Sequence, residues 1–264
     1  MITRRFTSNI LMIIMVPLFF LRAQNYAGVG FGGTDFHIID AHASPLIFGS
    51  LGITPDIQFI HKGENSLQYF EGSYYDNLLS SSSSNFNTQS WGGRLRFSFV
   101  QLIANPGILG RALSIYAGGS ACTFFTRQDY YYYYKPSAAN AVADVSWQWS
   151  HSLDISLAAE YDLTDREFLL AQIDMPVVSS ISRPQYSPSE DYNYSENVFK
   201  IKMFGAAELF PNYFSLDIRL NYQRPLFWNF NMQIGYEFFY SYYNKPSDIK
   251  MYMNNFRGGL FYCF

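Results

Sequence analysis

Charge is scarce in this chain and is not concentrated anywhere. Of its 264 residues, 18 are Lys or Arg and 21 are Asp or Glu, so 15% are charged and the formal net charge is -3. Globular proteins usually carry about 25% charged residues. Because the sequence has no run of Lys or Arg and no net positive field, we expect no nucleic-acid partner.

Cysteine and histidine are scarce as well, with two and four copies in the chain. They do not cluster at the spacings that metal ligands need, so we predict neither a metal site nor a cofactor. Cys122 and Cys263 lie at different heights of the predicted strands. We therefore predict no disulfide between them.

Serine lies close to histidine at two places, which raises the question of a hydrolase. Asp40, His42 and Ser44 share one face of a predicted strand, but side chains at i and i+2 lie about 6–7 Å apart, beyond hydrogen-bonding distance. His151 and Ser152 are adjacent, so their side chains diverge. Neither arrangement predicts a catalytic triad, and we assign no catalytic residue.

Long hydrophobic runs are absent after residue 23. The one such run, Ile10 to Leu21, follows Arg4 and Arg5 and precedes Ala23, which is the order of a secretory signal peptide. We expect cleavage after Ala23, with an uncleaved anchor helix as the alternative. No later stretch reaches the ~18 apolar residues of a membrane helix. The predicted parts are a signal peptide (residues 1–23), a lead-in (24–34) and a single β domain (35–264).

Aromatic residues and strict alternation are abundant. Tyr, Phe and Trp make up 19% of the chain. Residues 214–223 alternate without a break between an apolar set and a polar set. The apolar set is Phe214, Leu216, Ile218, Leu220 and Tyr222. Successive strand residues point to opposite faces, so this stretch predicts a strand with one apolar and one polar face.

The same pattern recurs along the chain in segments of about ten residues separated by turns. It predicts an all-β fold, a transmembrane antiparallel up-and-down barrel of twelve strands, with ten or fourteen as open alternatives. Val142–Ser150 and Leu153–Leu163 are the clearest predicted hairpin, turning at residues 151–152. With this count the long loop 183–197 lies on the side of the short turns, where it does not belong. A soluble sandwich or barrel is the alternative fold.

The end of the chain resembles the terminal strand of Gram-negative outer-membrane β-barrel proteins. Its last residues of one parity are apolar or small and the chain stops on an aromatic ring: Phe256, Gly258, Leu260, Tyr262 and Phe264. The resemblance implies an assembly signal at Phe256, Leu260, Tyr262 and Phe264 that the barrel-assembly machinery reads. It also implies an outer-membrane location with outer-membrane lipid around the barrel.

The polar parity of the strands predicts a lumen in which both signs of charge are mixed. The lumen-lining residues are Arg94, Arg96, Asp144, Asp154, Glu160, Asp162, Lys200, Lys202, Glu208, Asp217, Arg219, Glu237 and Arg257. Such a set can form a salt-bridge network that plugs the barrel, which we favour, or line a narrow aqueous passage.

This lumen predicts passive passage or binding of a small molecule, or a structural role in the envelope. A lipid-modifying hydrolase and a docking subunit for another envelope protein are the alternatives.

Overall fold

The computed structural model describes residues 24–41, 44–82, 87–108, 110–131, 142–164, 167–183 and 203–264. The expected signal peptide lies outside these residues. The strands are β1 (Gln24–Asp40), β2 (Ser44–Lys62), β3 (Ser66–Ser81), β4 (Asn87–Ala104), β5 (Gly107–Ile108), β6 (Arg111–Tyr131), β7 (Val142–Asp162), β8 (Phe168–Ser182), β9 (Ala206–Glu208), β10 (Tyr213–Phe227), β11 (Phe230–Tyr243) and β12 (Ile249–Cys263).

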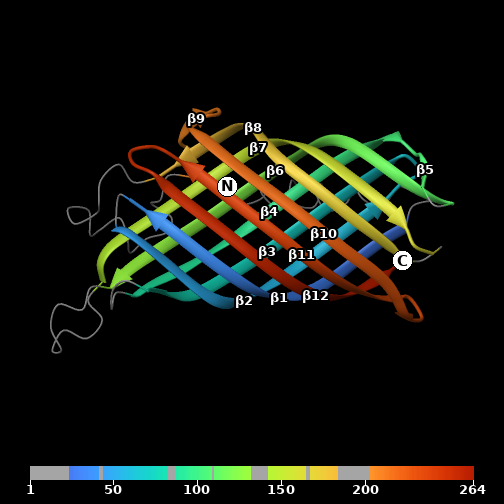
Figure 1. Ribbon diagram of the computed structural model, residues 1–264, viewed down its shortest axis with the longest axis horizontal. Coiled ribbons are helices and arrows are strands. Elements are labelled where there is room, and N and C mark those ends of the chain that lie inside the picture. The colour runs from blue at the N-terminus through green and yellow to red at the C-terminus, as the bar shows by residue number, and fades with distance from the viewer. Residues whose placement is uncertain are drawn as a thin grey trace, which may run out of the picture.

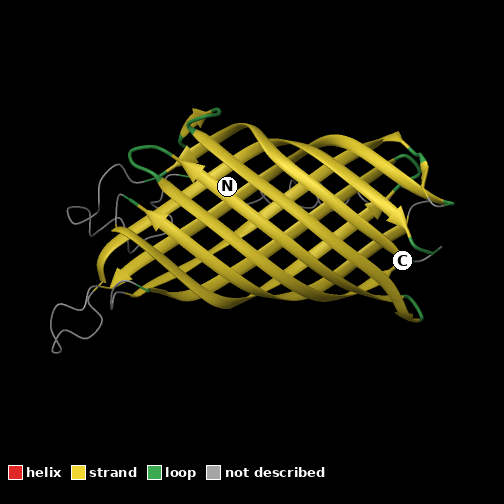
Figure 2. Ribbon diagram, viewed as in Figure 1, coloured by secondary structure: helices red, strands yellow, loops and turns green. Residues whose placement is uncertain are grey.

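The strands close into one antiparallel barrel (Figure 1). β1 pairs with both β2 and β12, and β8 pairs with β10, so the sheet has no free end. Ten strands form this wall, whereas β5 and β9 are short additions outside it. Every element drawn in Figure 2 is a strand or a loop. No helix in the described ranges is long and apolar enough to cross a membrane.

The predicted barrel is confirmed, and its wall has ten strands, one of the counts left open, because the wall strands are longer than assumed. The hairpin predicted at residues 151–152 is wrong: Val142–Asp162 is one continuous strand. β9 covers only Ala206–Glu208 and pairs with the end of β8. The expected lead-in, residues 24–34, is the first part of β1, where it pairs with β2 and β12.

The two ends of the barrel differ in their connections. At the terminal end, Asn25 and Phe264 exchange backbone hydrogen bonds of 3.2 and 3.0 Å, and the connections between strands are short. The other end, which we call the loop end, carries the connection from β8 to β10 that includes β9. β8 ends and β10 begins at the loop end, so the apparent misplacement of the connection after residue 183 came from counting β7 as two strands.

The outer wall carries an apolar belt between two rows of aromatic rings. Exposed aliphatic and aromatic side chains cover the belt: Val29, Leu51, Ile53, Leu95, Phe97, Ile155, Ile173, Leu220, Ile234 and Phe256. The terminal-end row includes Phe227, Trp228, Phe230, Tyr262 and Phe264. The loop-end row includes His37, Tyr252, Trp91, Phe125 and Trp149.

The height of the belt fits a lipid bilayer. Tyr252 and Tyr262 lie ten residues apart on β12, one in each aromatic row. Ten residues span roughly 33 Å along a strand, and a tilt of about 40° reduces this to about 25 Å. That is the usual height of the apolar band of an outer-membrane barrel, and aromatic girdles flank such a band. Arg257 lies halfway between the rows, so its inward side chain is near the middle of the span.

Candidate functional site

The lumen is filled by side chains in three layers. The layer at the loop end holds an apolar cluster, beside buried polar side chains such as Gln128 and Gln148, and the cluster includes Phe36, Ile38, Tyr75, Phe124, Phe239, Met251 and Met253. The layer at the terminal end is also apolar and includes Tyr26, Ile60, Leu67, Tyr69, Tyr116, Phe168 and Phe261. Between them lies the charge network, which consists of Arg94, Arg96, Arg219, Arg257, Glu71, Asp174, Asp217, Glu237, Asp56 and Asp154. All ten of its residues are buried.

Glu71 on β3 is the centre of one half of the network. Its Oε1 accepts a hydrogen bond of 2.9 Å from Arg257, and its Oε2 accepts one of 2.9 Å from the hydroxyl of Tyr69. Arg94 and Arg219 each place a guanidinium nitrogen 3.5 Å from the same carboxylate. The guanidinium of Arg219 also lies 4.6 Å from the centre of the Tyr69 ring. One carboxylate thus joins β3 to its neighbour β4 and, across the lumen, to β10 and β12.

Asp217 on β10 is the centre of the other half. Its Oδ2 accepts hydrogen bonds from Arg94, at 2.8 Å, and from Arg96. Arg94 also donates to Glu237. On the neighbouring strand, Asp174 accepts a hydrogen bond of 2.6 Å from Arg219. Paired charges with their hydrogen bonds made are the form in which charge is tolerated inside a protein.

The network contains more carboxylates than guanidinium groups, six against four. Asp56 and Asp154 are the two with the weakest pairing. Asp56 accepts a 2.9 Å hydrogen bond from Gln58 and lies 4.0 Å from Arg257. Asp154 accepts a 3.3 Å hydrogen bond from Ser120, and within the described part of the chain it has no cation within 4.0 Å. Its Oδ1 is buried without a hydrogen-bond partner.

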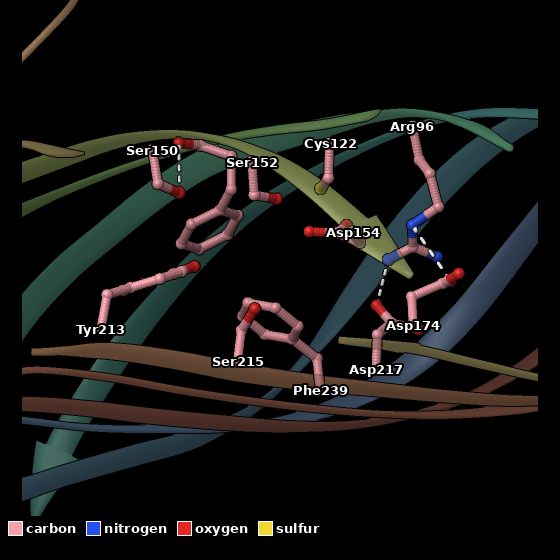
Figure 3. A pocket seen from close by; sticks show the side chains of 11 residues that line it. Arg96, Cys122, Ser150, Ser152, Asp154, Asp174, Tyr213, Ser215, Asp217 and Phe239 are labelled. Carbon is pink, nitrogen blue, oxygen red and sulfur yellow. Dashed lines mark hydrogen bonds and ion pairs between the residues drawn. The ribbon is translucent and has the colours of Figure 1, made fainter. Parts of the chain in front are cut away.

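A small cavity lies beside Asp154, where β8 and β10 separate. Its volume is about 10 Å³, which is room for about one water molecule. In Figure 3 the carboxylate of Asp154 lies in the middle of the lining side chains. The lining residues are Arg96, Cys122, Phe124, Ser150, Ser152, Asp154, Asp174, Tyr213, Ser215, Asp217 and Phe239.

The structure brings most of the expected lumen residues inside the barrel. Buried members of the network are Arg94, Arg96, Asp154, Asp217, Arg219, Glu237 and Arg257. Glu160 is buried at the terminal end, where it pairs with Lys62, whereas the Asp162 side chain is 41% exposed. Glu208 lies on β9, outside the wall. Lys200, Lys202 and the side chain of Asp144 lie outside the described residues.

Glu71 is not among the lumen residues predicted from the sequence, although it contacts more arginines of the network than any other carboxylate. The inward face of β3 carries Leu67, Tyr69 and Leu79 beside Glu71, so polar and apolar residues mix on both faces. The clean alternation used to assign the lumen is therefore absent there. Asp174 was missed as a lumen residue because β8 alternates poorly; a bulge beside Pro176 shifts its register with β7. The sequence signal for Glu71 is an acidic residue within an aromatic strand, and Asp76 on the opposite face of β3 gives the same signal.

The described histidines do not meet the serines that sequence analysis considered. His151 faces outward and contacts Thr123 at 3.0 Å, whereas Ser152 is buried in the lumen. His37, on the outer wall, pairs with Asp35 at 2.8 Å. His61 contacts Asn25 at 2.8 Å near the terminal end. His42 lies outside the described residues, so the group at residues 40–44 stays untested.

Two ion pairs fasten the connections at the loop end. Arg183, just after β8, pairs with Asp40 on β1 and donates a 2.7 Å hydrogen bond to the carbonyl of Ser247. Lys245 contacts both carboxylate oxygens of Glu208 at 2.9 Å. Burial alone would raise the pKa of Glu208, but hydrogen bonds from Lys245 and Asn212 outweigh it and hold that pKa below its ordinary value.

The last strand has the orientation that the sequence predicted. Phe256, Leu260, Tyr262 and Phe264 are all exposed on the outer wall. Their role as an assembly signal stays a prediction. In the described part of the chain no disulfide joins Cys122 to Cys263.

No protein-family model and no curated protein matches the chain. Among solved structures, the outer membrane protease OmpT from Escherichia coli is similar with a TM-score of 0.56 and 11% identity, over 91% of this chain and 97% of that one. The translocator domain of the autotransporter NalP from Neisseria meningitidis has a TM-score of 0.38 and 10% identity, over 98% and 95%. At such identity the first likeness shows the fold alone, that of outer-membrane β-barrel proteins.

Proposed function

We propose that the protein is a barrel of the Gram-negative outer membrane that serves as a structural or binding component of the envelope and not as an open axial pore. The observation that carries this proposal is the filling of the lumen. A solute moving along the axis would meet an apolar layer, the charge network and a second apolar layer. Each layer consists of buried side chains with mutual contacts.

The location in the outer membrane is supported by the outer wall. An apolar belt of about 25 Å between aromatic rows suits lipid and would be costly in water. A closed barrel also satisfies its backbone hydrogen bonds within hydrocarbon. The exposed aromatic end of β12 is the feature that the assembly machinery would recognise.

Conductance in planar bilayers tests the absence of an axial pore. We expect the refolded protein to insert without steady open-channel current, whereas a general porin reconstituted in parallel conducts. Heat-modifiable migration on electrophoresis confirms that the same sample is folded. A steady conductance from folded, inserted protein would contradict the proposal.

Fractionation of the native envelope tests the location. We expect the protein in the outer-membrane fraction, with the heat-modifiable migration typical of a barrel. Recovery from the soluble periplasm alone would contradict the proposed location.

A further inference from the structure

The wall between β8 and β10 is only partly paired. Their register runs for seven residue pairs, from Phe168 opposite Gln223 to Asp174 opposite Asp217, and ends there. Closer to the loop end, β8 pairs with β9 instead. Residues 175–178 of β8 and 213–216 of β10 continue the two strands beyond this point and are not paired with each other. We call this stretch the open seam.

The cavity beside Asp154 lies directly inside the open seam. Tyr213, Ser215 and Asp217 line it from β10, and Asp174 lines it from β8. On the outside, Met175 and Val177 of β8 are exposed on the apolar wall. At the open seam, only the thickness of the wall therefore lies between the buried polar cavity and the lipid-facing surface.

The electrostatics of this cavity favour a positive guest. Asp154, Asp174 and Asp217 line it, against one guanidinium, that of Arg96. Asp174 and Asp217 are already paired with arginines, whereas Asp154 is 9% exposed and has one oxygen without a partner. An ionised carboxylate that is buried and unpaired is costly, and a cation is the partner that removes the cost.

The size and lining of the cavity select among cations. Space for about one water molecule admits a primary ammonium group but not a quaternary one. The hydroxyl groups of Ser150, Ser152 and Ser215 offer further acceptors, and the ring of Phe239 offers an aromatic face. Among the described residues, no group of three His, Cys, Asp or Glu side chains has the geometry of a metal site.

We propose that this cavity binds a primary ammonium group with Asp154 as its counter-ion, and that the carbon chain bearing the group passes through the open seam. The ammonium can belong to a lipid headgroup in the surrounding leaflet or to a dissolved amine, since both present the same chemistry. The proposal does not depend on whether the lumen conducts along its axis.

Cys122 provides a built-in reporter because its thiol lines the same cavity. In a Cys263→Ser background, the rate of Cys122 modification by a small thiol reagent reports whether the cavity is occupied. Ethanolamine is the soluble probe, and ethylene glycol, which replaces the ammonium by a hydroxyl, is its neutral control. At ten times the dissociation constant we expect ethanolamine to slow the modification about tenfold.

Two variants show whether Asp154 is responsible. Asp154→Asn removes the counter-ion, and we expect the protection to disappear. Asp56→Asn removes the other weakly paired carboxylate, which does not line the cavity, and we expect the protection to remain. Equal protection by ethylene glycol or by sodium, or protection that survives in Asp154→Asn, would overturn the proposal.

The lipid composition of the bilayer distinguishes the two possible sources of the ammonium group. Bilayers of phosphatidylethanolamine with phosphatidylglycerol are compared with bilayers in which phosphatidylcholine replaces the ethanolamine lipid. Protection in the first bilayer without added amine assigns a lipid source, and protection by dissolved amine alone assigns an aqueous one.

A second measurement applies if the thiol of Cys122 does not react with the reagent, either with or without amine. The urea midpoint of unfolding is then compared with and without ethanolamine. We expect ethanolamine to raise the midpoint of the wild-type protein and to leave that of Asp154→Asn unchanged. No shift in the wild type, with no protection by amine or lipid, would overturn the proposal.

Discussion

The middle layer of the lumen and the two apolar layers fill the same barrel by opposite chemistry. In the apolar layers, each side chain contributes by the area that it removes from water, so the loss of one residue is felt mainly by its neighbours. In the charge network each arginine contacts carboxylates from several strands. The loss of one arginine therefore removes a partner from several buried carboxylates at once.

Arg219→Met tests this coupling in the middle layer. Arg219 contacts Glu71 at 3.5 Å and Asp174 at 2.6 Å, and its side chain is completely buried. Removal of one partner from a buried ion pair costs about 3–5 kcal/mol. We expect a loss of that size in the free energy of unfolding, measured by urea titration of the barrel in detergent or lipid.

The control for this variant is Arg224→Met on the same strand. Arg224 pairs with Glu167 at 3.2 Å, but its side chain is 58% exposed. An exposed ion pair contributes roughly 0–1 kcal/mol. Equal losses of unfolding free energy in the two variants would contradict the view that ion pairs in the lumen depend on one another while those on the surface do not.

Leu67→Ala tests the terminal-end apolar layer. Leu67 is 1% exposed and lies in the cluster with Tyr26 and Phe261. Truncation of a buried leucine costs about 2–5 kcal/mol, set by the cavity that remains. We expect a loss of about 2–3 kcal/mol, smaller than that of Arg219→Met, because the neighbouring rings can partly close the space.

Leu78→Ala is the matched control on the outer face of β3. Leu78 is 64% exposed on the outer wall. Lipid or detergent can fill the space that its side chain leaves, so we expect a loss below about 1 kcal/mol. A larger loss at residue 78 than at residue 67 would mean that the inside of the barrel is not the better-packed side.

The outer wall could be predicted from the sequence because side chains that face lipid must be apolar. Across the apolar belt the strands turn apolar or small residues outward, so parity alone assigned Arg96, Asp217 and Arg219 to the inside. Inward side chains, in contrast, need only fill the lumen and pair their charges. Leucine, tyrosine and glutamate all satisfy that demand on β3, and parity could not identify Glu71 there.

The error in β7 has a physical reason that the sequence contained. Strands were assumed to match the thickness of the bilayer, so a segment of 21 residues was divided in two. However, apart from His151, the polar residues keep even numbers from Ser146 to Glu160, on both sides of the supposed turn. An unbroken parity is the sign of one strand, since a two-residue turn reverses the chain and starts a new register. The open seam has no such signal, because it depends on which strands become neighbours.

Lys245→Met tests a weaker contact, at the loop end outside the lumen. Lys245 fastens Glu208 of β9 to the connection between β11 and β12, and its side chain is 51% exposed. An ion pair of this exposure contributes at most about 1 kcal/mol. We expect little change in global unfolding, but faster proteolytic cleavage around β9. Lys250→Met, which removes a 4.0 Å contact with Asp248, is the control and should leave the cleavage rate unchanged.

The same contact predicts a dependence on pH. Because the folded pKa of Glu208 lies below its ordinary value, its contribution is fully present above that ordinary value, about 4.3, and is lost as the pH falls through the folded pKa. Acidification below about pH 4 should therefore accelerate cleavage around β9 in the wild type. In Lys245→Met this acceleration should be smaller, because the neutral side chain no longer distinguishes the two protonation states of Glu208. An equal acceleration in both proteins would assign the effect to another group.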